Sequence, residues 1–213
     1  MNSPSLTLWS DASFFSPYAM SVYVALSEKA LPFSVKPVDL MREEQHQSAY
    51  RELSLTCRVP LLQIDDFLLN ESTAITEYLE ETFPAPEYKR LYPRDREKRA
   101  RAREIQAWLR SDLLPLRQER PTGVLFAGQR LPPLSTAAEE SAAKLITATL
   151  RLLPEGQQNL FGEWTIVDTD LALMLNRLAL HGDPLPLKLL NYAEFQWQRA
   201  SVQLWLAESG KKR

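Results

Sequence analysis

The stretch "VPLLQIDDFLLNESTAITEYL" (Val59–Leu79) joins two kinds of pattern in one short segment. Two apolar runs flank the pair Asp65 and Asp66, which is a good turn sequence, so the first part predicts a β-hairpin. Ser72 then precedes a segment with helical periodicity and is expected to cap it. The apolar positions at that spacing are Ile75, Tyr78 and Leu79. We therefore expect strand, strand and helix in succession.

The preceding residues extend this pattern towards the N-terminus. The run "LTLWS" (Leu6–Ser10) suits a buried strand, and the long apolar segment Pro17–Leu31 suits a buried helix. Alternation in "FSVKPVDL" (33–40) predicts another strand. Pro37 lies inside it and cannot donate to a sheet ladder, so this strand should lie at an edge. The order strand, helix, strand, strand, strand, helix ends near Phe83.

The second half of the chain has a different character. "PAPEYKRLYP" (84–93) carries three prolines and is typical of a linker, and no strand pattern follows it. Amphipathic patterns predict helices over 94–118, 135–154, 165–180 and 187–208, the last segment holding one or two. "TIVD" (165–168) is a capping-box pattern at one of these starts. We predict an α/β domain over 1–83, a linker over 84–93 and an all-helical domain over 94–213.

Composition excludes several classes of function. The chain has 213 residues, 25 basic and 27 acidic side chains and a net charge of -2, which gives no reason to expect nucleic acid as a partner. Cys57 is the sole cysteine of the sequence, so no intrachain disulfide can form, as suits a reducing compartment. No run of about 20 apolar residues predicts a membrane span. We expect a cytoplasmic protein without a metal site.

Ser16 and Pro17 open the long apolar segment. Serine is favoured at the N-cap and proline at the first helical position, so Ser16 is explained as a simple cap. A buried helix that opens at a strand end also presents free N–H groups and a positive dipole end, which together make an anion site. From these residues alone, both interpretations stay open.

Two further motifs lie in the stretch Val59–Leu79. Val59 precedes Pro60, and an X-Pro bond is the kind with an appreciable cis population, although a trans proline at a strand start is the commoner case. Glu71 and Ser72 precede a helix, where a hydroxyl and N–H groups can hold a carboxylate and the acid can accept from an ammonium group. An ordinary cap beside a solvated acid is the alternative.

Taken together, these motifs resemble the cytosolic glutathione S-transferases. The resemblance rests on "SPYA" (16–19), on Val59-Pro60, on Glu71-Ser72 and on the split into an N-terminal thioredoxin-like domain and a C-terminal helical domain. It covers essentially the whole chain. The segments "LFGEW", "DTDLALM" and "FQWQRASVQ" add a likeness to a bacterial member of the family.

The resemblance implies a glutathione S-transferase of serine type. Ser16 would be the catalytic hydroxyl, and it would donate to the glutathione sulfur because the thiolate is the nucleophile. Glu71 and Ser72 would bind the γ-glutamyl end, a cis Val59-Pro60 bond would be present, and Val59 would pair through its backbone. Arg58 would bind the glycyl carboxylate, a solvated arginine being the alternative.

The resemblance also implies partners. We expect glutathione as co-substrate, no prosthetic group, a small hydrophobic electrophile or an organic hydroperoxide as second substrate, and a homodimer. "SPYA" lacks the cysteines of a "CPYC" motif, which disfavours thiol–disulfide exchange at Ser16, and Cys57 is expected to be structural. A non-enzymatic binding or interaction module of the same fold remains the alternative.

Overall fold

The structure is a computed structural model and describes residues 4–210. The contacts within the chain divide it into two compact units. The first comprises the described residues up to Leu91 together with those from Leu204 onward, and the second comprises Tyr92–Gln203. This division into compact units does not test the predicted domain boundaries at 83 and 94, which stay a prediction.

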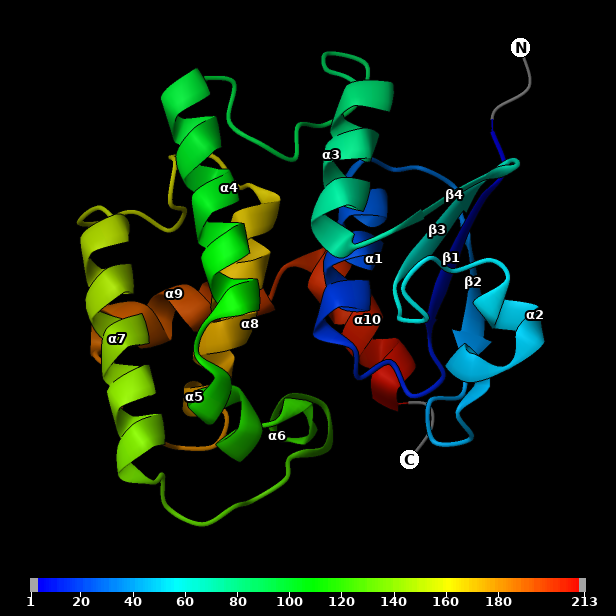
Figure 1. The fold of residues 1–213 in the computed structure, drawn as a ribbon. Coiled ribbons are helices and arrows are strands. Elements are labelled where there is room, and N and C mark those ends of the chain that lie inside the picture. The colour runs from blue at the N-terminus through cyan, green and yellow to red at the C-terminus, as the bar shows by residue number, and fades with distance from the viewer. Residues whose placement is uncertain (1–3, 211–213) are drawn as a thin grey trace. The chain divides into compact units, whose positions relative to one another are not determined.

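The first unit contains a four-stranded sheet and the helices that cover it (Figure 1). Its elements in chain order are β1 (Leu6–Asp11), α1 (Pro17–Glu28), β2 (Ser34–Val38), the 3-10 helix η1 (Glu44–His46), α2 (Ser48–Arg51), β3 (Leu61–Ile64), β4 (Phe67–Asn70) and α3 (Ser72–Thr82). The last helix, α10 (Ala200–Gly210), contributes its residues from Leu204 onward.

The sheet has the order β2-β1-β3-β4 and is mixed. Strand β1 pairs parallel with β2 and antiparallel with β3, and β3 and β4 form the predicted hairpin around Asp65 and Asp66. Strand β2, which contains Pro37, is an edge strand as predicted. The expected α/β organisation of this part of the chain is therefore confirmed.

Both faces of the sheet are covered. Helix α1 packs against β1 and α3, and its apolar residues are almost all buried, as expected for a helix that is hydrophobic on most sides. On the other face, Tyr50 of α2 packs with Val38, Leu61 and Trp9. Figure 1 shows α1 and α3 on one side of the strands and α2 on the other.

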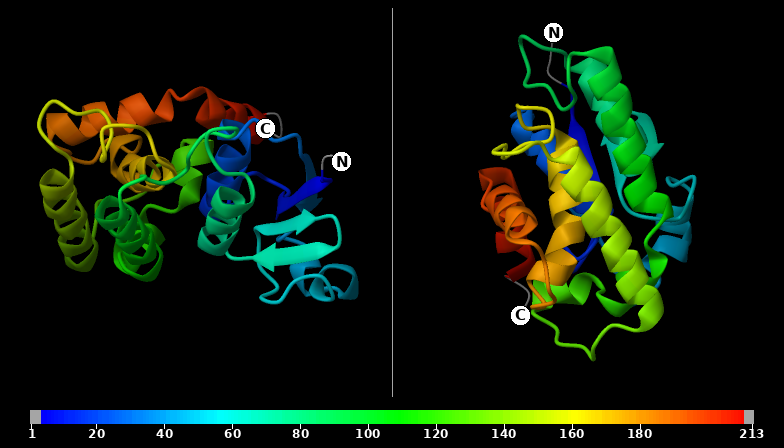
Figure 2. Two further views of the ribbon diagram at one scale, coloured as in Figure 1. Left: turned by 90° about the horizontal axis from the view of Figure 1, so that it is seen from above. Right: turned by 90° about the vertical axis from the view of Figure 1, so that its left-hand side faces the viewer.

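The second unit is helical. Its elements are α4 (Arg96–Ser111), α5 (Leu114–Glu119), α6 (Thr122–Ala127), α7 (Thr136–Leu152), α8 (Ile166–Ala179), α9 (Leu187–Trp197) and the first residues of α10. Helix α8 is the core helix, in contact with α4, α6 and α9 (Figure 2), and almost every one of its residues is buried. The predicted capping box is present, with Thr165 and Asp168 each bonding the backbone of the other.

Two predictions in this unit were wrong. The expected single helix over 94–118 ends at Ser111, because Leu113 has a φ of 61° and α5 starts after it with Pro115 in its first turn. The segment 119–134, where no helix is predicted, contains α6, whose apolar side chains are buried. Among residues 4–210, no helix combines the length and apolar character needed to cross a bilayer.

Candidate active site

The hydroxyl of Ser16 caps α1. Ser16 has extended backbone geometry, its Oγ accepts from the Ala19 N–H at 3.2 Å, and Pro17 follows at the first helical position. This confirms the predicted Ser-Pro helix start. The cap uses a lone pair of Oγ and leaves the hydroxyl proton for a second partner, so capping and donation to a ligand are compatible. An N–H bond to Oγ also polarises the O–H bond and makes it a better donor.

The start of α1 favours an anion. The helix is buried along most of its length, and its first turn contains no acidic residue. The positive end of its dipole therefore lies at Ser16, where the Ser16 N–H donates to Asp11 Oδ1 and the Ala19 N–H donates to the Ser16 hydroxyl oxygen. Pro17 removes one of the first N–H groups of the helix without loss, since that group has no partner inside a helix.

The register of the sheet brings the predicted motifs to one end. Trp9 of β1 pairs with Leu61 of β3, and Leu61 pairs with Asn70 of β4. The end of β1, which leads to Ser16, therefore lies at the same end of the sheet as the start of β3 and the end of β4. The motifs Val59-Pro60 and Glu71-Ser72 thus emerge beside the β1–α1 loop.

The backbone of the 54–60 loop is held firmly at Arg58. The Arg58 carbonyl oxygen accepts from the Tyr50 hydroxyl at 2.7 Å and from Asn70 Nδ2 at 3.2 Å, while its side chain is exposed. Burial raises the pKa of Tyr50 to about 12, so this donor stays protonated near neutrality. The Val59-Pro60 bond is cis, as the resemblance implied.

Asn70 is a residue that the sequence did not single out. It is 7% exposed, and its amide makes four hydrogen bonds to the 54–60 loop. Nδ2 donates to the carbonyl oxygens of Arg58 (3.2 Å) and Pro60 (3.1 Å), and Oδ1 accepts from Ser54 Oγ (3.1 Å) and Leu55 N–H (2.9 Å). Because Asn70 directly precedes Glu71, it ties the two predicted glutathione-binding segments together.

Glu71 and Ser72 occupy different positions from those expected. Glu71 is the N-cap residue of α3, with a φ of 69° and an exposed side chain that makes no capping bond. Ser72 is 4% exposed and is the first residue of the helix, so the prediction that it is the cap was wrong. The exposed carboxylate and the start of α3 nevertheless lie next to each other.

Cysteine and histidine side chains do not form a second reactive centre in the described part of the chain. Cys57 is half-buried in the 54–60 loop and has a φ of 52°. His181 Nδ1 lies 3.1 Å from Asp183 Oδ2, and its Nε2 accepts from the Leu131 N–H. Within residues 4–210 no group of three or more potential metal-binding side chains is found.

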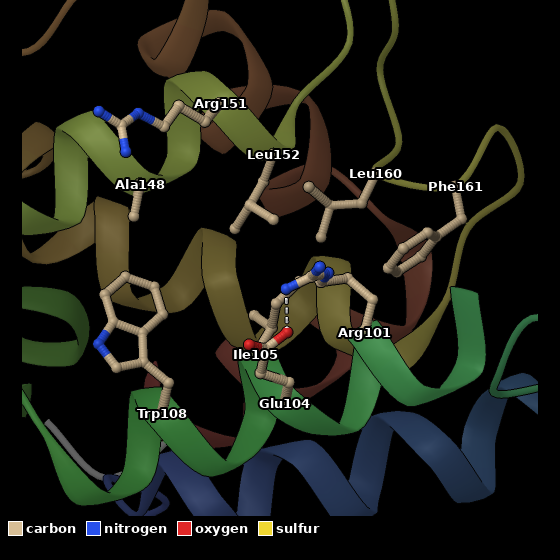
Figure 3. Close-up of a pocket in the computed structure, with 9 residues that line it drawn as sticks. All are labelled: Arg101, Glu104, Ile105, Trp108, Ala148, Arg151, Leu152, Leu160 and Phe161. Atoms are coloured by element: carbon tan, nitrogen blue, oxygen red, sulfur yellow. Dashed lines mark hydrogen bonds and ion pairs between the residues drawn. The ribbon is translucent and has the colours of Figure 1, made fainter. Parts of the chain in front are cut away.

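A pocket of about 700 Å³ lies in the second unit and contains none of the predicted site residues (Figure 3). Figure 3 shows apolar side chains from α4, α7 and the segment before α8 around it. Its carboxylate and its indole N–H are already engaged, since Glu104 pairs with Arg101 and the Trp108 indole N–H donates to Asp112. Without a free nucleophile or base, this pocket is not the candidate active site.

Two family matches cover most of the sequence. Residues 15–82 match "Glutathione S-transferase, N-terminal domain", and residues 95–211 match "Glutathione S-transferase, C-terminal domain". The chain belongs to the glutathione S-transferase family. The family resemblance inferred from Ser16, Val59-Pro60 and Glu71-Ser72 is therefore confirmed, and so is the fold class.

Relatives of this glutathione S-transferase have several names. A glutathione transferase homolog from Burkholderia gl BGR1, solved with bound glutathione, is 46% identical with a TM-score of 0.82, over 97% of this chain and 99% of that one. The maleylacetoacetate isomerase of Rattus norvegicus is 31% identical over 73% of this chain and 68% of its own length. A probable maleylacetoacetate isomerase of Drosophila melanogaster is 43% identical, but the match spans 45% of this chain and 41% of that relative.

Proposed function

We propose that this glutathione S-transferase is of serine type and transfers glutathione to small hydrophobic electrophiles. The observation that carries the proposal is Ser16 at the start of the buried helix α1, with Oγ accepting from Ala19 and its proton free for a ligand. Support comes from the Burkholderia homolog, which is 46% identical and binds glutathione. A narrower kinship with the bacterial glutathione S-transferase YfcF is part of the same proposal.

The chemical requirement is a thiolate. The free thiol has a pKa of about 8.5, so only a few per cent of it is ionised at neutral pH. A hydrogen bond to a charged group contributes about 1.5–3 kcal/mol, which corresponds to about one to two pKa units. Ser16 and the dipole of α1 are together sufficient to bring the pKa of the bound thiol close to neutrality. Serine acts here as a donor and forms no covalent intermediate.

The remaining predicted residues would bind the tripeptide. Glu71 would accept from the glutathione ammonium group, and Ser72 with the first N–H groups of α3 would hold the γ-glutamyl carboxylate. The Val59 backbone would pair with the extended peptide as an added strand does. Arg58, whose side chain is exposed, would meet the glycyl carboxylate.

The second substrate is proposed by class. Thiolate attack on a carbon electrophile gives a conjugate, and attack on an organic hydroperoxide releases an alcohol and leaves an oxidised sulfur for a second glutathione. Both reactions need the same ionised sulfur.

A role in detoxification or oxidative stress, a cytoplasmic location and a homodimeric state belong to the same proposal.

An isomerase is a second candidate, favoured by the 31% identity to the rat maleylacetoacetate isomerase. A thiolate that adds reversibly to a conjugated cis double bond allows rotation and leaves again, so glutathione is regenerated. Measuring thiol consumption separates the two reactions: a transferase consumes one glutathione per turnover, whereas an isomerase consumes none. Constant thiol with maleylacetoacetate turnover would favour the isomerase.

The non-enzymatic alternative and the disulfide-reductase alternative are tested separately. A transferase must be retained on immobilised glutathione and eluted by the free tripeptide, and must also turn over an aryl halide. Retention without turnover would support a binding module, and the lack of both would remove glutathione from the account. Full activity of Cys57→Ala would dismiss a mechanism that depends on that thiol.

A further inference from the structure

Asp11, the last residue of β1, is a buried carboxylate directly before the loop that carries Ser16. It is 5% exposed. Its Oδ2 accepts from the Phe15 N–H at 2.7 Å, and its Oδ1 accepts from the Ser16 N–H at 2.9 Å and from the Ser10 hydroxyl at 3.3 Å. A buried charge is costly unless hydrogen bonds compensate for the water it has lost, so a carboxylate at this position calls for a specific role.

The loop between β1 and α1 is fixed from several sides. The Ala12 N–H donates to the Val38 carbonyl oxygen at 2.8 Å, and the Phe14 N–H donates to the Asp11 carbonyl oxygen at 3.1 Å. Phe14 has a φ of 57°, and its buried ring packs on Trp205 of α10, with 4.9 Å between ring centroids. The carboxylate completes this arrangement at the two residues nearest the helix.

We infer that Asp11 is the positioning residue of Ser16: its two carboxylate oxygens fix the backbone from which the hydroxyl addresses the glutathione sulfur. The inference rests on the proposed role of Ser16. The Phe15 N–H and the Ser16 N–H bond different oxygens of Asp11, and an asparagine replaces one of these oxygens with an NH2 group, which donates and cannot accept, so one of the two N–H groups loses its acceptor. The chemistry of the site therefore explains why an acid stands here.

A positioning role and a purely electrostatic role of Asp11 predict opposite shifts of the thiol pKa when the carboxylate is removed, so an experiment can separate them. A negative charge near a thiolate disfavours the thiolate and raises its pKa, so a role through charge alone means that removing the charge lowers the thiol pKa. A positioning role means the reverse, because a displaced Ser16 hydroxyl no longer stabilises the thiolate. The sign of the shift separates the two roles.

The test compares Asp11→Asn with Asp65→Asn. Asp65 is a matched control, because its Oδ1 also accepts a backbone N–H, that of Ser5 at 3.0 Å, at the far end of the hairpin. For Asp11→Asn we expect kcat with an aryl halide to fall about tenfold or more and the KM for glutathione to stay within about threefold. The pKa in the profile of kcat/KM against pH should rise by about one unit. Asp65→Asn should match the wild type in all three.

A double variant and a longer acid extend the test. Asp11→Asn should add no more than about a twofold loss to Ser16→Ala, because a positioning residue has nothing left to position. The inference would be overturned if the double variant lost activity by the product of the two single losses. It would also be overturned if the thiol pKa fell or stayed unchanged in Asp11→Asn. If Asp11→Asn does not fold, Asp11→Glu keeps both oxygens one methylene further out and should show the same upward shift, in smaller measure.

The inference can fail independently of the proposed function. Amide hydrogen exchange at Phe15 and Ser16 reports the two bonds without any catalysis, and at least one of the two sites should lose protection in Asp11→Asn and in Asp11→Glu. Unchanged protection contradicts the inference even if Ser16 is catalytic. Conjugation that survives Ser16→Ala within about twofold contradicts the proposed function instead, whatever the exchange data show.

Discussion

Asn70 Nδ2 donates to the Arg58 carbonyl oxygen at 3.2 Å, across twelve residues of chain. The same carbonyl oxygen also accepts from the Tyr50 hydroxyl. Asn70 thereby links the segment that ends with Val59 to the segment that begins with Glu71. The proposed glutathione-binding surface is thus organised by the backbone carbonyls that buried side chains hold, rather than by the exposed side chains alone.

Asn70→Asp tests this link. The change keeps an acceptor for Ser54 and Leu55 but replaces the donor to Arg58 and Pro60 with an oxygen that repels their carbonyls. We expect the KM for glutathione to rise about tenfold and the free energy of unfolding to fall by about 1–3 kcal/mol, with kcat changed less. Steady-state kinetics and urea unfolding measure both. Asn191→Asp, at an exposed position of α9, is the control; an equal effect there would contradict the assignment.

Tyr50 predicts a specific loss of stability at high pH. Its pKa is raised by burial to about 12 in the folded protein, against 10.0 for an ordinary tyrosine. The folded state therefore keeps a proton that the unfolded chain loses, so the associated stability is present below pH 10 and is lost as the pH rises from 10 to 12. Tyr50→Phe removes this contribution, and unfolding measured across that range should depend less steeply on pH than in the wild type. Parallel curves would show that the hydroxyl ionises freely.

Lys29 and Glu80 form a buried ion pair in the first unit. Lys29 Nζ lies 2.9 Å from Glu80 Oε2 and also donates to the Phe83 and Lys89 carbonyl oxygens, so it anchors the end of α3 and the segment that follows. Lys29→Met leaves a buried carboxylate without its countercharge and should cost about 3–5 kcal/mol in urea unfolding. The double variant Lys29→Met/Glu80→Gln should recover part of this loss. A double variant as unstable as the sum of both single variants would contradict the pairing.

The capping box at Thr165 should matter for stability alone. Thr165 Oγ1 donates to the buried Asp168 carboxylate at 2.9 Å, and that carboxylate also accepts from Leu160 N–H and the Tyr192 hydroxyl. Thr165→Ala should lower the free energy of unfolding by about 0.5–2 kcal/mol. Its kcat and KM should not change. Thr147→Ala, at an exposed position of α7, is the matched control and should cost nothing.

Much of the fold was predictable because the signals are local. The turn at Asp65-Asp66, the edge position of the strand with Pro37 and the cap at Ser16 each depend on a few neighbouring residues. The break at Leu113 was missed because apolar periodicity continues through it, although Pro115, which does not fit inside a helix, was a local signal for a break.

The supporting residues of the site were harder to predict. Asn70 was missed because its partners are backbone groups of a loop that only the folded chain brings near. Asp11 left a weak signal, a lone acid after an apolar strand and shortly before a Ser-Pro helix start. Its role became visible only when both of its oxygens were found on the amides of Phe15 and Ser16.

Ultraviolet titration of the thiolate in bound glutathione is the most direct measurement of the central claim. It should be made on the wild type, Ser16→Ala and Ser16→Thr, each with saturating glutathione. We predict a thiol pKa about one to two units below the free value of about 8.5 in the wild type, a return towards that value in Ser16→Ala, and retention of the lowered value in Ser16→Thr. Equal thiol pKa values in the wild type and Ser16→Ala, with glutathione bound to both, would contradict the account.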